Sequence, residues 1–336
     1  MVFPWRIGVA TGVGSLPYED MDEAVRVVAG ELADFAHLPE LPARGVGADM
    51  VGRTASLLVD MPVDLQPSGW RLTDSPGADA RRAAALLRAD LDALEIALLG
   101  YAGPLKIQVA GPFTLATAID RPRGDRLLAD HGARRDLAQS LAEGLRAHRD
   151  GIVARVPNAQ VVVQVDEPGL PAVLAGSVPT ASGFGRHRSV HESEVEELLR
   201  GVLGSAGPFP VVHCCAASPP AALLRRAGAE VLSVDIGVLD PAVLDELREV
   251  VDGGLALWPG VVPANEPDAV PTDSDLARRL QRFYDGLDAD PAAMLPGTVV
   301  TPACGLAGAS VPWSRTAYRL ARDTAAAFAE LVGAAG

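Results

Sequence analysis

Cysteine and basic residues are scarce in this chain. Three cysteines in 336 residues, two of them adjacent, do not make a disulfide framework. Lysine and arginine number 29 against 43 acidic residues, so the net charge is −14. A chain without a basic face does not neutralise phosphates, which argues against nucleic acid and anionic membrane surfaces as partners. The first residues are apolar only in short pieces broken by Arg6 and glycines, which fits neither a signal peptide nor a membrane span. We therefore expect a protein of the reducing cytoplasm with free thiols.

The length and the apolar content fit one large α/β domain. The hydrophobic fraction is 49%, and short β-branched runs alternate with longer segments of helical period. The predicted strands are Arg6–Ser15, Ala33–Leu38, Leu105–Ala110, Ala159–Val165, Phe209–Cys215, Glu230–Ile236, Leu255–Val262 and Thr298–Cys304. The predicted helices are Met21–Leu32, Asp79–Leu99, Gly124–Val156, Ser193–Leu203, Pro219–Ala227, Pro241–Val251, Asp273–Leu287 and Pro312–Val332. This alternation favours a single (β/α)₈ barrel over residues 1–336, although a doubly wound open sheet has a similar pattern.

All three cysteines follow or end predicted strands. His213-Cys214-Cys215 ends the fifth strand, Asp235 ends the sixth, and Cys304 ends the eighth. These positions fall on the carboxyl-terminal face of a barrel, where barrel sites are built. His213 and Cys215 are two residues apart, so they project to the same side of a strand. Most free cysteines are small buried hydrophobes, but this grouping favours metal ligands. Two thiolates, an imidazole and a carboxylate suit zinc.

These motifs resemble the catalytic barrel of cobalamin-independent methionine synthase, over nearly the whole chain. The resemblance implies a TIM barrel of the type also found in uroporphyrinogen decarboxylase. It implies a zinc ion held by His213, Cys215, Asp235 and Cys304, with an aspartate where the family usually has glutamate. Cys214 fills the variable position between two ligands and is expected to pack inside the barrel wall.

Two further motifs resemble the residues with which the family binds its amino-acid substrate. Gly12-Val13-Gly14-Ser15-Leu16-Pro17 is similar to the family's loop that holds the amino-acid carboxylate through Gly14 and Ser15. A glycine-rich turn is also a ready anion cradle on physical grounds. Asp166, in Asp166-Glu167-Pro168, matches the acid that pairs with the substrate ammonium. The second ammonium-binding acid falls on Glu40, with Asp49 as the competing candidate.

The folate half of the family site is missing. The tryptophan that stacks on the pterin falls on Ala118, the folate-contacting glutamate falls near Ala172, and an Arg-Cys pair is replaced around Gly77-Ala78. The proton-donating histidine falls on Asn265, which is no useful acid at neutral pH. We therefore expect a methyl donor other than polyglutamyl methylfolate, such as a methylated corrinoid, which a partner protein would hold.

Three functions compete. The first is a zinc-dependent methyltransferase that converts homocysteine to methionine, and Ser15 and Asp166 favour it because they suit an amino-acid acceptor. The second is a corrinoid- or coenzyme-linked methyltransferase that acts on another thiol. The third is a non-catalytic barrel with a relict zinc site, which Asn265 supports and the cysteines oppose. A decarboxylase would need more arginines at the mouth than Arg44 and Arg53.

Overall fold

The computed structural model describes residues 2–333, and its centre is one parallel sheet of eight strands. Around the sheet the order is β1-β11-β10-β9-β8-β7-β5-β2. The strands are β1 Val9–Ala10, β2 Ala36–His37, β5 Pro104–Ala110, β7 Gln160–Asp166, β8 Val211–His213, β9 Val231–Asp235, β10 Ala256–Val262 and β11 Val299–Pro302. Each lies within or overlaps a predicted strand, so the prediction of a (β/α)₈ barrel is confirmed.

The barrel closes just beyond β1 and β2, where their extensions pair. Glu40 N donates to Gly14 O at 3.1 Å, and Leu16 N donates to Glu40 O at 2.8 Å. Ser15 and Glu40 form the corresponding parallel bridge. The seam that closes the ring therefore consists of residues that the sequence places at the substrate.

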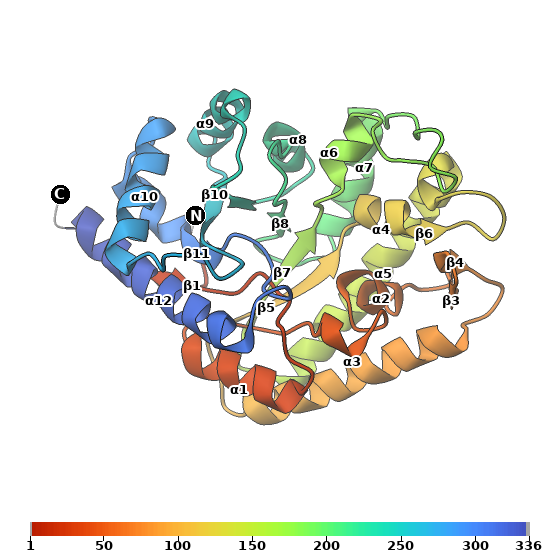
Figure 1. Cartoon of the computed structure of the whole chain (residues 1–336), viewed down its shortest axis with the longest axis horizontal. Coiled ribbons are helices and arrows are strands. Elements are labelled where there is room, and N and C mark those ends of the chain that lie inside the picture. Colours follow the sequence, from red (N-terminus) through yellow and green to blue (C-terminus); the bar gives the residue numbers. More distant parts are fainter. Residues whose placement is uncertain (1, 334–336) are drawn as a thin grey trace.

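Helices encircle the strands (Figure 1). They are α1 Met21–Glu31, α3 Ala78–Ala97, α5 His131–Arg155, α7 Glu192–Leu203, α8 Ala221–Arg226, α9 Leu244–Asp252, α10 Asp273–Gly286 and α12 Val311–Gly333. Within residues 2–333, no helix combines the length and apolar character that a membrane crossing requires. The predicted helix Gly124–Val156 is wrong at its start: Gly124 has φ +94°, and Asp130 caps the helix by accepting from Ala133 N. A left-handed residue and an N-cap both place the boundary after Asp130.

Four short helices and a small sheet lie in the connections. The helices are α2 Met50–Ala55, α4 Pro112–Ala118, α6 Leu170–Leu174 and α11 Pro291–Met294. The strands β3 Val63–Gln66 and β4 Gly69–Leu72 form a hairpin, and β6 Ile119–Asp120 pairs with β4. This sheet lies at the edge of the molecule beside α2 and α4 (Figure 1). The sequence prediction contained none of these elements.

The amino-terminal end of the barrel is filled with aromatic rings. Trp5 stacks on Phe35 with ring centroids 5.4 Å apart, and Trp258 meets both rings edge to face. Val162 and Val211 from β7 and β8 belong to the same buried cluster. This apolar plug closes one end, so the polar interior side chains above it open only toward the carboxyl-terminal face.

Candidate active site

One cavity of about 270 Å³ opens at the carboxyl-terminal ends of the strands. Every predicted site residue except Asp235 lines it: Gly14, Ser15, Glu40, Asp166, His213, Cys215 and Cys304. Asp49, the competing candidate, lines it as well, and Pro42, Met50 and Pro168 give it apolar walls. The barrel therefore brings residues from five separate parts of the sequence to one small space.

The cysteine and histidine ligand candidates converge. Single ligand atoms of His213, Cys215 and Cys304 all lie within 4.8 Å of one another, and the two sulfurs are 3.3 Å apart. Nδ1 of His213 bonds Ser233 Oγ at 2.9 Å, while its buried Nε2 has no hydrogen-bond partner within residues 2–333. Such a contact to one ring nitrogen fixes the orientation of a metal-binding imidazole and leaves the other nitrogen for the metal. The donor set and the free nitrogen fit zinc.

The three thiols differ in their surroundings. The hydrogen bond with Cys215 lowers the pKa of Cys304 to about 4, and the same contact raises the pKa of Cys215. Burial raises the pKa of the third thiol, Cys214, to about 12. Cys214 is fully buried, which agrees with its interpretation as barrel packing. Only the Cys215–Cys304 pair therefore combines partial exposure with a thiolate.

Asp235 ends β9 but does not join this group. Its Oδ1 accepts from the backbone N–H of Gly237 at 2.8 Å, and burial raises its pKa. The nearby charges of Cys304 and His213 act on this carboxyl group, so it lies at the edge of the ligand cluster. Its role as a fourth ligand stays a prediction.

The predicted carboxylate cradle adjoins the cysteine loop. Leu306 N donates to Ser15 O at 2.8 Å. A β-carbon built on Gly305 would lie 2.1 Å from Ser15 Oγ, so a glycine is required beside the serine. The turn at Gly14 and Ser15 is thereby fixed to the loop that carries Cys304.

Two buried carboxylates face the other side of the cavity. Glu40 and Asp166 are 3% and 5% exposed, and Glu40 Oε1 is buried with no hydrogen-bond partner within residues 2–333. Burial raises the pKa of both, that of Asp166 to about 7. Asp49 differs because its carboxylate already accepts from Gly52 N at 2.7 Å and caps α2. Glu40 Oε1 thus accepts no hydrogen bond, and its nearest ion-pair partner, Arg53 Nε, lies 3.9 Å away.

Several polar side chains beneath this cavity were not singled out from the sequence. Lys106 and Gln108 of β5 and Gln164 of β7 are buried inside the barrel. A signal was present, because polar residues alternate with apolar ones in a strand that is buried along its whole length. Glu167 was also passed over: it accepts from Phe113 N and Thr114 N at 2.8 Å each and so fixes the start of α4.

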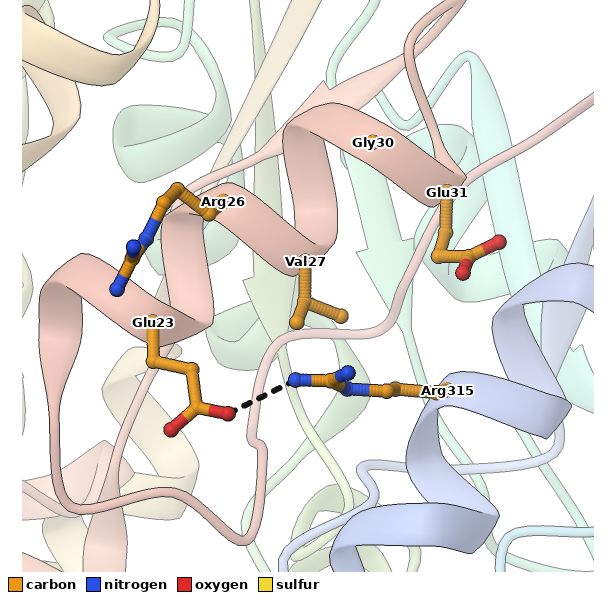
Figure 2. Close-up of a pocket in the computed structure, with 6 residues that line it drawn as sticks. All are labelled: Glu23, Arg26, Val27, Gly30, Glu31 and Arg315. Atoms are coloured by element: carbon orange, nitrogen blue, oxygen red, sulfur yellow. Dashed lines mark hydrogen bonds and ion pairs between the residues drawn. The ribbon is translucent and has the colours of Figure 1, made fainter.

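Another hollow, of about 390 Å³, lies on the outer surface between α1 and α12 (Figure 2). Glu23 and Arg315 form an ion pair across it at 2.8 Å, and Arg315 also donates to Tyr18 Oη. Its charged groups are exposed and partly satisfy one another. It offers no nucleophile or metal-ligand cluster comparable to that at the barrel mouth.

Fold and site together define an α/β barrel with a thiolate-rich, zinc-type ligand cluster beside an acidic pocket. The family model described as "Cobalamin-independent synthase, Catalytic domain" matches residues 8–327. The chain belongs to the cobalamin-independent methionine synthase family.

Solved structures agree with the fold. A B12-independent methionine synthase from Shewanella sp. W3-18-1, in complex with selenomethionine, has a TM-score of 0.62 at 13% identity and covers 98% of this chain and 99% of that one. An enzyme that targets the pectin rhamnogalacturonan II has a TM-score of 0.48 at 8% identity and covers 95% of this chain and 39% of its own, too weak a likeness to inform function. A search of curated proteins returned no match.

Proposed function

We propose that this protein transfers a methyl group to the thiol of homocysteine and so forms methionine, with zinc bound at His213, Cys215 and Cys304. One observation carries the proposal: the ligand cluster and the predicted amino-acid-binding residues line the same cavity of about 270 Å³. An amino acid with a short thiol side chain carries at its two ends the groups that these two sets of residues would bind. The Shewanella synthase, which has the same fold, was crystallised with selenomethionine.

The chain's own residues hold the substrate in this proposal. Backbone N–H groups and the hydroxyl at Gly14 and Ser15 bind the carboxylate, while Glu40 and Asp166 accept from the ammonium. The thiol then points to Cys215 and Cys304. Zinc, when bound, lowers the pKa of a coordinated thiol, so that more of it is thiolate at neutral pH.

The reaction itself is a displacement. A bond forms between the homocysteine sulfur and the methyl carbon while the bond from that carbon to the donor breaks, and the thiol proton is lost to solvent. A fixed orientation of the two reactants supplies much of the acceleration in such a step. Asp235, at the end of β9, would be the fourth ligand of a bound zinc ion when no substrate thiol occupies that position.

We propose a methylated corrinoid, free or on a partner protein, as the donor. Ala118, Ala172 and Asn265 stand where the family carries its contacts to folate. Pro42, Met50 and Pro168 in the wall of the cavity offer no cation for a polyglutamate tail.

The test is methionine formation by zinc-loaded protein with homocysteine and either methylcobalamin or methyltetrahydrofolate, followed by mass spectrometry. We expect methionine from methylcobalamin, and its loss in Cys304→Ser but not in the matched Cys214→Ser. Methionine from methyltetrahydrofolate alone would contradict the donor assignment. Methylation of simple thiols in preference to homocysteine would favour the other-thiol alternative.

A further inference from the structure

Lys106 is the single lysine of the chain, and it is fully buried inside the barrel. A buried ammonium is costly unless hydrogen bonds and opposite charges compensate it. Its Nζ donates to Val13 O at 2.7 Å and to Gln108 Oε1 at 3.0 Å. Lys106 is not one of the described residues that line the cavity. Any role in binding therefore acts through its neighbours.

Two glutamines extend from this ammonium toward the two acids. Gln164 Nε2 donates to Val13 O at 2.9 Å and to Asp166 Oδ1 at 2.7 Å. On the other side, Gln108 Nε2 donates to Leu38 O at 2.7 Å, and the Gln108 side chain lowers the pKa of Glu40. A row of polar side chains thus extends from Lys106 to Asp166 on one side and to Gln108, close to Glu40, on the other.

The two buried acids at the ends of this row of polar side chains also need a positive charge nearby. Glu40 and Asp166 are both buried, which raises the pKa of each; the charge of Glu40 raises the pKa of Asp166 further, whereas Lys106 lowers the pKa of both. Arg53 Nε lies 3.9 Å from Glu40 Oε1 and lowers the pKa of Glu40. Lys106 therefore acts on both acids, whereas Arg53 acts on Glu40.

We propose that Lys106 is a positioning residue for the substrate ammonium: it is the shared countercharge that lets Glu40 and Asp166 face one cavity together. This inference rests on the proposed amino-acid substrate. The carboxylate cradle depends on Lys106 less, because Val13 O keeps its hydrogen bond from Gln164 when the lysine is removed. Loss of Lys106 therefore weakens recognition of the amino group in particular.

The experiment compares two ligands on zinc-loaded wild type and on Lys106→Met, an uncharged side chain of similar length. One ligand is homocysteine, and the other is 4-mercaptobutyrate, which is homocysteine without its amino group. Calorimetric titration gives both affinities, and zinc content and thermal unfolding show that each protein is folded and loaded. We expect homocysteine affinity to fall at least about tenfold, while 4-mercaptobutyrate affinity stays within about twofold of wild type.

Equal or tighter homocysteine binding by Lys106→Met would overturn the inference, as would a parallel loss for both ligands. If Lys106→Met does not fold, Gln108→Met breaks the link to Glu40 and leaves the charge. It is expected to show a smaller loss of the same kind, and no change would overturn the inference. Wild type that binds homocysteine no better than 4-mercaptobutyrate would instead contradict the amino-acid substrate itself.

Discussion

Substitution of Glu40 by glutamine removes the one cavity carboxylate that, within residues 2–333, has a buried oxygen without a hydrogen-bond partner. A hydrogen bond to a charged group contributes about 1.5–3 kcal/mol, which corresponds to roughly 10–150-fold in affinity. We expect Glu40→Gln to lose homocysteine affinity in that range. The shape of the side chain is kept, so zinc content and folding are expected to stay unchanged.

The matched control is Asp49→Asn, because Asp49 lines the same cavity with the same charge. Its carboxylate is already engaged with Gly52 N, and asparagine caps a helix about as well as aspartate, so the substitution keeps α2 capped and changes homocysteine affinity by less than about threefold. Isothermal titration of zinc-loaded proteins measures both. A larger loss in Asp49→Asn than in Glu40→Gln would refute the assignment of the ammonium site to Glu40.

Three further predictions concern stability, the cradle and the fourth ligand. Asp90→Ala leaves Arg53 buried without its 2.8 Å partner, so urea unfolding should show a loss of about 3–5 kcal/mol, and a change below about 1 kcal/mol would contradict this. Gly305→Ala places a β-carbon against Ser15 Oγ and should weaken homocysteine and 4-mercaptobutyrate alike in calorimetry, whereas loss of one alone would refute it. Asp235→Asn should lower zinc affinity at least about tenfold in chelator competition, and an unchanged affinity would remove it from the ligand set.

The sequence predicted the barrel strands well because their signal is local. β5, β7 and β10 are continuous apolar or alternating runs, each buried over most of its length. The β3–β4 hairpin has only four residues in each strand and partly exposed side chains, so it left no clear periodicity. Short elements that tertiary packing stabilises are hard to read from sequence.

The candidate site, like the fold, could be predicted from the sequence only in part. The Cys215–Cys304 pair could be predicted because residue type and strand position both pointed to it. The link between Ser15 and Glu40 could not, since it depends on how the first and second βα units meet when the ring closes. Lys106 stands in a run that otherwise indicates only a buried strand. One of its partners is Gln108 of the same strand, and the other, Val13 O, lies beyond β1, far away in the sequence.

The most direct test of the central claim is metal content together with proton release on homocysteine binding. The account predicts about one zinc per chain in wild type and in Cys214→Ser, its loss in Cys304→Ser, and release of a thiol proton when homocysteine binds to the zinc-loaded protein. Zinc that persists in Cys304→Ser, or zinc-loaded protein that does not respond to homocysteine, would contradict a thiol-activating zinc site in this barrel.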